Sequence, residues 1–181
     1  AEFGRLEEDI SAMYVQGNFD GDGFRGNADV RYVQTDATGI AHNGTSNFSV
    51  ENNYTDWLPS FNLSIDVADD LIFRTAASRV ISRPKYSDLM PTLSSRNETL
   101  QRINQGNINL DPYRANQFDF GVEWYFSEAS MASLAFFYKD IEAFIAQSAT
   151  TVENFQDPVN PGTWTVLQPV NGEGGKTEGI E

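Results

Sequence analysis

The chain of 181 residues carries 26 acidic and 12 basic side chains, a net charge of −14, and contains no cysteine. This charge excludes the basic footprint of a nucleic-acid-binding protein, and the lack of cysteine excludes disulfides and thiolate metal sites. Hydrophobic residues make up only 40% but aromatic residues 13%, which favours strands that meet a membrane interface over a large two-sheet core.

No stretch approaches the roughly 18–20 apolar residues of a transmembrane helix, whereas strands with alternate apolar residues are compatible with a membrane barrel. The opening residues, AEFGRLEEDI, lack the basic start and apolar core of a signal peptide. The last residues, KTEGIE, look like the start of another strand. We therefore expect an internal fragment of a longer protein, with residues 1–181 forming one partial domain.

Two strands are predicted in the first third of the chain. Residues Glu8–Phe19 alternate irregularly, and Asp20–Gly23 (DGDG) has the composition of a tight turn. In Phe24–Thr35 one face carries Phe, Gly, Ala, Val and Tyr, and the other carries Arg, Asn, Asp and Arg, which is too polar for a soluble core. Asp36–Asn53, rich in Thr, Ser, Asn and Gly, is predicted to be a long loop or a floppy hairpin.

Two further strands follow in the middle of the chain. Tyr54–Val67 alternates apolar and polar residues, Ala68–Asp70 is a tight turn, and Leu71–Arg83 carries three arginines. A proline directly after this strand ends it, because proline cannot donate to a sheet ladder. Lys85–Ala115 is then predicted to be a long outer connection, with a helical turn at Ser87–Met90.

The most regular alternation is a hairpin over Asn116–Gln147, with its turn at Ser127–Ser130. In its first arm, large apolar residues share one face, and charged or small residues share the other. The apolar set is Phe118, Phe120, Val122, Trp124 and Phe126, and the polar set is Asp119, Gly121 and Glu123. After the hairpin, Ser148–Gly162 is predicted to be a polar loop and Thr163–Gln168 a short strand.

Short and long connections alternate three times along the chain. The turns at Asp20–Gly23, Ala68–Asp70 and Ser127–Ser130 are each followed by a strand and then by a long polar stretch. Outer-membrane barrels show this pattern, because their periplasmic turns are short and their extracellular loops are long. The pattern predicts an all-β fold of antiparallel up-and-down strands that is part of a large transmembrane β-barrel.

The alternation of connections also orients the strands. Tyr54 and Trp57 are predicted at the outer interface, and Trp124, Tyr125 and Phe126 at the inner one, because aromatic girdles form at both interfaces. The apolar face of the central hairpin would then meet lipid, and its polar face would meet a lumen.

Three stretches resemble TonB-dependent outer-membrane receptors. Residues 54–91 run YTDWLPSFNLSIDVADDLIFRTAASRVISRPKYSDLMP, residues 106–126 run GNINLDPYRANQFDFGVEWYF, and residues 137–145 run FYKDIEAFI. The positions that carry the first likeness are Tyr54, Leu58, Pro59, Ser60, Asn62, Arg74, Ser82, Arg83, Pro84, Leu89 and Pro91. Those that carry the second are Gly106, Asn107, Leu110, Pro112, Asp119, Gly121, Glu123, Trp124, Tyr125 and Phe126.

This resemblance covers nearly the whole chain in the family's order. It implies a slice of the C-terminal half of a barrel of about 22 strands with a plugged lumen, in the bacterial outer membrane. It further implies contact with the lipid bilayer and lipopolysaccharide, and uptake of a scarce nutrient such as a siderophore, cobalamin or an oligosaccharide. The TonB complex would act through a plug domain, but the plug, the TonB box and the closing strand have no counterpart in these residues.

Nothing in the sequence indicates catalysis, a cofactor or a metal site. His42, the single histidine, lies in a Ser/Thr/Asn stretch and is interpreted as a solvated loop residue rather than a ligand. No HExxH, Ser–His–Asp or P-loop spacing occurs. Asp119 and Glu123 could form the carboxylate pair of a glycosidase, but we interpret them as lumenal charges opposite arginines of neighbouring strands.

Arg74, Arg79 and Arg83 are interpreted in the same way, as partners of lumenal or plug carboxylates. In the long outer connection, Tyr86 and Tyr113 are candidate ligand contacts, because aromatic rings stack on sugars or siderophores. Two alternatives stay open at this point: a secreted β-sandwich that binds carbohydrate, and a β enzyme that acts on glycosides. A chain that is soluble and monomeric without detergent would favour the sandwich.

Overall fold

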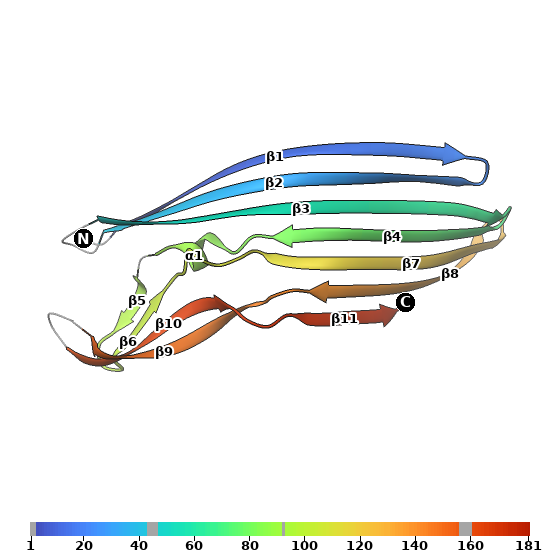
Figure 1. Cartoon of the computed structure of the whole chain (residues 1–181). Coiled ribbons are helices and arrows are strands. Elements are labelled where there is room, and N and C mark those ends of the chain that lie inside the picture. The colour runs from blue at the N-terminus through green and yellow to red at the C-terminus, as the bar shows by residue number, and fades with distance from the viewer. Residues whose placement is uncertain (1–2, 43–46, 92, 156–160) are drawn as a thin grey trace.

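One long sheet of seven strands makes up most of the chain, of which the computed structural model describes residues 3–42, 47–91, 93–155 and 161–181 (Figure 1). The strand order is β1-β2-β3-β4-β7-β8-β11, and every neighbouring pair is antiparallel. This arrangement confirms the predicted all-β, up-and-down fold, with a barrel that these strands leave open. The strands are β1 (Phe3–Gly21), β2 (Phe24–His42), β3 (Asn47–Ala68), β4 (Leu71–Ser82), β7 (Tyr113–Ser127), β8 (Ser130–Ile141) and β11 (Gly175–Ile180).

The connections of this sheet are sorted by length. Residues 22–23, 69–70 and 128–129 form the turns from β1 to β2, from β3 to β4 and from β7 to β8, and the three turns lie at one end (Figure 1). The opposite end, called the outer end, carries the connections 43–46, 83–112 and 142–174. The predicted alternation of short and long connections is therefore confirmed for the second and third pairs. The first long connection is wrong, because β2 and β3 continue to His42 and Asn47 and only residues 43–46 join them.

For the stretch Asp36–Asn53 the sequence predicted either a long loop or a floppy hairpin, and the structure shows the hairpin. The ladder between β2 and β3 runs without interruption from Phe24 and Ile65 to His42 and Asn47. Its outer half carries polar side chains on both faces, so it lacks the apolar alternation by which a strand is recognised. The two strands therefore continue well beyond the part that carries an apolar face.

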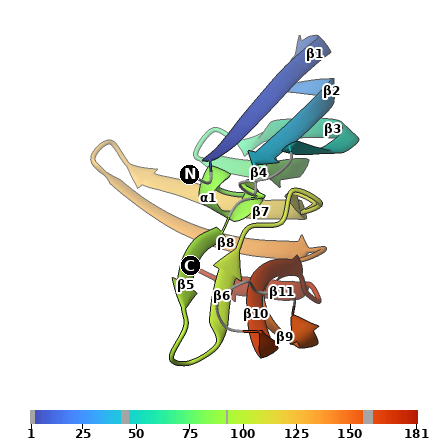
Figure 2. The same ribbon diagram turned by 90° about the vertical axis from the view of Figure 1, so that its left-hand side faces the viewer.

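A second sheet of four strands lies at the outer end, on the side of the molecule remote from β1 (Figures 1 and 2). Its order is β5-β6-β10-β9, and β6 and β10 pair in parallel. Its core contains the buried side chains of Ile103, Trp164 and Val166, with Val152 packed against them. The strands are β5 (Leu93–Asn97), β6 (Arg102–Gln105), β9 (Ile145–Phe155) and β10 (Gly162–Asn171).

The second sheet shows that two predicted loops are wrong, because they contain strands. Lys85–Ala115 contains β5 and β6, and Ser148–Gly162 contains most of β9. The second arm of the central hairpin ends at Ile141 rather than Gln147, because the chain crosses there into the second sheet. Thr163–Gln168 is confirmed as a strand, within β10. The loop predictions failed because a small sheet buries few side chains, so its strands are mixed in polarity.

A single helix, α1 (Tyr86–Leu89), occurs in the described residues, and it agrees with the helical turn predicted at Ser87–Met90. No helix within these residues is long and apolar enough to cross a membrane. The connection that contains α1 folds back against the outer half of β2, where Ala37 and Ala41 are buried. A Cβ on Gly39 would lie 2.6 Å from Ile108 Cδ1. Small side chains on β2 therefore let this connection lie directly on the strand.

Gly106 marks a close approach between α1 and the end of β6. An added Cβ would lie 2.3 Å from the Met90 carbonyl oxygen and 2.8 Å from that of Asp88, and backbone atoms cannot rotate away as a side chain can. Gly106→Ala is therefore expected to destabilise the outer end by about 1–3 kcal/mol. Faster hydrogen exchange over residues 85–107 would show this loss. Gly172→Ala is the control, because its Cβ would meet nothing closer than 3.6 Å, and equal exchange in both variants would contradict the prediction.

Candidate functional site

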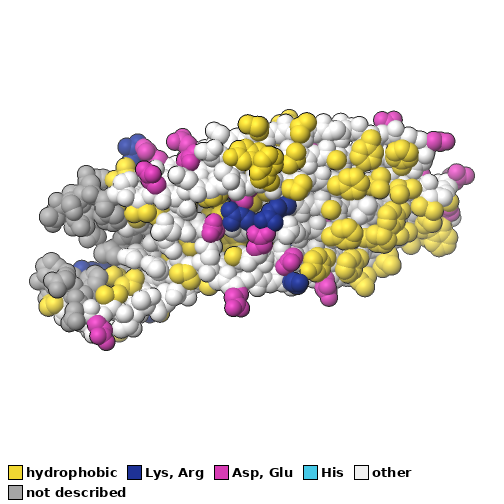
Figure 3. Space-filling view, in the orientation of Figure 1, with side chains coloured by type: hydrophobic (Ala, Val, Ile, Leu, Met, Phe, Trp, Pro, Cys, Tyr) yellow, Lys and Arg dark blue, Asp and Glu magenta, His cyan; other side chains and the backbone are white. Residues whose placement is uncertain are grey.

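The long sheet has one apolar face, called the outward face, over the half that lies next to the short turns (Figure 3). Aromatic rings contact one another there across neighbouring strands. The ring centroids of Tyr32 and Trp57 lie 5.0 Å apart, and those of Phe73 and Phe120 lie 4.4 Å apart. The strand register confirms the predicted apolar face of β7, which carries Phe118, Phe120, Val122, Trp124 and Phe126.

Two aromatic residues predicted at the membrane interfaces lie on the opposite, inner face. Tyr54 pairs with the buried Thr35 on that face, and the Tyr125 hydroxyl donates to Glu123 Oε2 at 3.0 Å. The alternation of β7 predicts this inner position for Tyr125, and neither tyrosine side chain can face lipid, because alternate residues of a strand point to opposite faces. Trp57 does point outward and is 61% exposed, but it lies in the middle of β3 rather than at its end.

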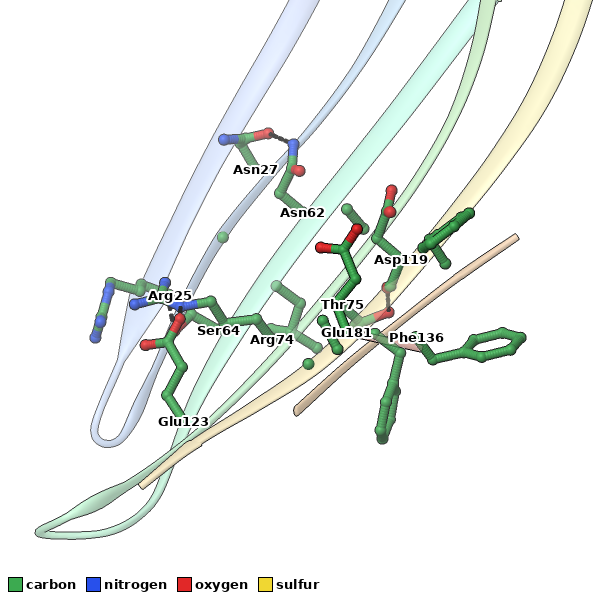
Figure 4. A pocket seen from close by; sticks show the side chains of 17 residues that line it. Arg25, Asn27, Asn62, Ser64, Arg74, Thr75, Asp119, Glu123, Phe136 and Glu181 are labelled. Atoms are coloured by element: carbon green, nitrogen blue, oxygen red, sulfur yellow. Dashed lines mark hydrogen bonds and ion pairs between the residues drawn. The ribbon is translucent and has the colours of Figure 1, made fainter. Parts of the chain in front are cut away.

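The inner face is polar and hollowed (Figure 4). A cavity of about 830 Å³, called the inner cavity, lies over β2, β3, β4, β7 and β8. Charged and amide side chains link neighbouring strands across this face, so their polar groups satisfy one another without a dry core. The links join Arg25 to Asp66 (3.1 Å), Arg74 Nε to Glu123 Oε1 (2.8 Å) and Asn62 Nδ2 to Asn27 Oδ1 (2.9 Å).

The predicted pairing of inner-face charges is confirmed for Glu123, which faces Arg74. Asp119 lines the same cavity but lies opposite Ala76 in the register rather than opposite an arginine. The predicted carboxylate partners of the three arginines are present. They are Glu123 for Arg74, Glu142 for Arg79 at 2.5 Å, and Glu8 for Arg83 at 3.7 Å. The predicted lumenal position of Arg79 is wrong, because Arg79 pairs with Asn116, which lies on the outward face of β7.

Loss of the Arg74 charge is expected to have a small effect. The side chains of Arg74 and Glu123 are 47% and 23% exposed, and exposed ion pairs contribute about 0–1 kcal/mol because water screens them. Arg74→Gln should therefore change the free energy of unfolding of the full-length protein by less than about 1 kcal/mol. Denaturant unfolding in detergent would measure this, and a larger loss would show that the pair is shielded from water in the complete barrel.

A second group of charges lies at the outer end, beyond the apolar part of the sheet. Arg114 Nε donates to Oδ1 of the buried Asp56 at 2.6 Å, and Arg114 Nη1 donates to Asp111 Oδ1 at 3.4 Å. Burial alone would lower the pKa of Arg114, but the hydrogen bond to Asp56 and its charge raise this pKa above the ordinary value, so the guanidinium stays charged. Arg83 donates to Thr35 Oγ1 at 3.3 Å. Arginines at both ends of the connection 83–112 thus hold it against the inner face.

The structure places the two tyrosines predicted to contact ligand in different surroundings. Tyr86, in α1, is 64% exposed, and its hydroxyl lies 3.5 Å from Glu8 Oε2. Tyr113 begins β7 instead of lying in a loop, and its ring meets that of Phe144 edge-on at 6.4 Å. His42 ends β2, and its side chain lies outside the described residues. Within the described ranges, no group of three or more His, Cys, Asp or Glu side chains is arranged to hold a metal.

The family model described as TonB dependent receptor-like, beta-barrel matches residues 2–181. The chain belongs to this family of TonB-dependent receptors. Its members are outer-membrane transport receptors and not enzymes, so the β-sandwich and the glycoside-acting enzyme are the wrong alternatives. No curated protein sequence matches the chain.

Solved structures of siderophore receptors share the fold. A variant of the ferric enterobactin receptor PfeA from Pseudomonas aeruginosa, in complex with enterobactin, has a TM-score of 0.62 and 14% identity, over 98% of this chain and 33% of that one. The siderophore receptor PirA matches with a TM-score of 0.54 and 15% identity in P. aeruginosa, over 98% and 39% of the two chains. PirA from Acinetobacter baumannii matches with a TM-score of 0.55 and 12% identity, over 98% of this chain and 34% of that one. The chain thus spans about a third of these receptors, and at such identities the likeness establishes the fold alone.

Proposed function

We propose that these residues form part of the wall of a bacterial outer-membrane receptor that takes up a scarce small nutrient with energy from the TonB complex. The observation that carries this proposal is the division of one sheet into an apolar outward face and a polar, hollowed inner face. A wall between lipid and a wet lumen needs this division, because a lysine or arginine that faces lipid at mid-membrane costs about 2–4 kcal/mol. The TonB complex would act through a plug domain outside these residues.

The sorted connections supply the orientation of this wall. Short turns would face the periplasm and long connections the exterior, so the outward face would contact the lipid bilayer and, in the outer leaflet, lipopolysaccharide. The connections 83–112 and 142–174 would meet the nutrient first, and the inner cavity would lie on its way to the periplasm. The nutrient classes that suit this arrangement are siderophores, cobalamin and oligosaccharides.

Tyr86 is proposed as a ligand contact and Tyr113 as a weaker candidate, because only the ring of Tyr86 is largely exposed. Tyr86→Ala in the full-length receptor should weaken nutrient binding about 3- to 10-fold, equivalent to roughly 0.5–1.5 kcal/mol for a lost ring contact. Tyr113→Phe, which keeps the ring against Phe144, should bind as the parent does. Nutrient binding measured by titration would test both variants, and unchanged binding in Tyr86→Ala would remove this residue from the site.

The transport proposal is tested with the full-length receptor in a strain that lacks its own copy. Cell fractionation should place the receptor in the outer membrane. Uptake is screened with a ferric siderophore, cobalamin and a labelled oligosaccharide, and uptake of one of them should require both the receptor and TonB. A receptor recovered in the soluble fraction, or uptake that continues without TonB, would contradict the proposal.

A further inference from the structure

A second cavity, of about 420 Å³, lies at the outer end between α1 and the second sheet, and is called the outer pocket. Asp88 lines it from α1, Arg102 and Gln105 from β6, and Gln147 from β9, and the buried Pro169 of β10 also contributes. The outer pocket shares no lining residue with the inner cavity. Its volume falls in the range of about 300–1,000 Å³ that is typical of sites for small molecules.

Hydrogen bonds between its walls fix the shape of the outer pocket. The backbone N–H of Asn107 donates to the Asp88 carbonyl at 2.6 Å, and Asn107 Nδ2 donates to the Pro169 carbonyl at 3.0 Å. Gln105 Nε2 donates to Gln168 Oε1 at 3.1 Å. Asn107 therefore joins α1 to β10 without help from a ligand. A pocket that is formed in advance avoids the ordering cost that binding otherwise includes.

Polar groups of the outer pocket are available to a ligand. Among the residues that the structure describes, none forms an ion pair with Asp88 or Arg102, and none forms a side-chain hydrogen bond with Arg102 or Gln147. One positive and one negative side chain leave the pocket without net charge, so its charge complements neither an anion nor a cation. The carboxylate accepts, the guanidinium donates, and the amide does both.

From these features we infer that the outer pocket binds an uncharged polyhydroxylated ligand, a sugar unit of an oligosaccharide. Each sugar hydroxyl both donates and accepts, which matches the mixture of groups on Asp88, Arg102 and Gln147. Vicinal hydroxyls also suit the two-pronged carboxylate and guanidinium, and the apolar surface of Leu167 and Pro169 suits the C–H face of a sugar ring. The inference rests on the proposed function, because it names the ligand class that the outer end of such a receptor would select.

Titration calorimetry of the full-length receptor tests this inference, in a polyoxyethylene detergent that has no sugar headgroup. The probes are maltose, cellobiose, purified lipopolysaccharide and, as a small anion, citrate. One of the disaccharides is expected to bind, and Gln147→Leu and Arg102→Met should each weaken this binding about tenfold, because each removes a hydrogen bond to a hydroxyl. Thr150→Val is the matched control, because Thr150 lies on the opposite face of β9 from Gln147.

Each outcome bears on the inference. Citrate binding that Arg102→Met abolishes, without disaccharide binding, would overturn it in favour of an anion site. Disaccharide binding that is equal in all variants, or no binding of any probe, would overturn it as well. Lipopolysaccharide binding that is lost in Gln147→Leu would support the sugar chemistry and assign it to the cell's own surface glycan. TonB-dependent uptake of any nutrient would support the transport function separately, even where sugar binding fails.

Discussion

The Arg114→Met variant of the full-length receptor is expected to lose about 3–5 kcal/mol of local stability at its outer end. Methionine keeps much of the side-chain length, but it leaves the carboxylate of Asp56 buried without its cation. A charge left alone out of water accounts for the size of the loss. In the described part of the chain, Asp56 Oδ2 already has no hydrogen-bond partner, so no spare donor is available to replace the guanidinium.

Hydrogen exchange of the connection 83–112 measures this effect, because Arg114 holds its end to the inner face. The double variant Asp56→Leu/Arg114→Met removes both charges and should recover most of the protection, since apolar pairs of similar volume replace buried ion pairs well. Arg74→Gln, at an exposed pair, supplies the contrast. If the double variant exchanges as fast as Arg114→Met, the unpaired carboxylate of Asp56 is not the cause of the lost protection.

The Phe120→Lys variant is expected to fail to assemble in the outer membrane. Phe120 lies within the outward face, where it contacts the ring of Phe73 and pairs with Phe136. A lysine that faces lipid at mid-membrane costs about 2–4 kcal/mol, a large share of the 5–15 kcal/mol by which a folded protein is ordinarily stable. Outer-membrane fractionation, together with the migration of unheated receptor on a denaturing gel, would measure assembly.

Ala76→Lys is the matched control for this charge. Ala76 belongs to β4, lines the inner cavity and pairs with Asp119, so its lysine would meet water and a carboxylate. This variant should assemble as the parent does. Assembly of Phe120→Lys at the parent level would mean that the outward face does not meet lipid, and the proposed orientation of the wall would fail.

The strands of the long sheet could be predicted from the sequence because each has one apolar and one wet face. Phe118, Phe120 and Val122 occupy alternate positions of β7, and two-residue turns break the chain at regular places. Period-two alternation and turn composition act over a few residues, so a single sequence contains them in full. The inner-face position of Glu123 followed from the same alternation, and its partner Arg74 lies on the neighbouring strand.

The outer end was harder to predict from the sequence, because its strands do not have one apolar and one wet face. Its strands project beyond the apolar half of the sheet, so polar residues occupy both faces of the outer parts of β2 and β3. Asp56 and Arg114 are 58 positions apart, and no local pattern links two residues across such a distance. The one available signal was an acidic residue at an inner position of an alternating strand. The outer pocket likewise joins α1, β6, β9 and β10, which only the tertiary fold brings together.

The parallel pairing of β6 with β10 makes one cooperative unit of two loops. Residues 102–104 pair with residues 165–167, and the Thr165 N–H donates to the Gln101 carbonyl at 2.8 Å. Neither connection can unfold without breaking this ladder, so Ile103 and Val166 should exchange their amide hydrogens with a common opening free energy. A molecule that binds to either connection would slow the opening of both. These two connections should therefore open as a single foldon, although distant segments of the chain build it.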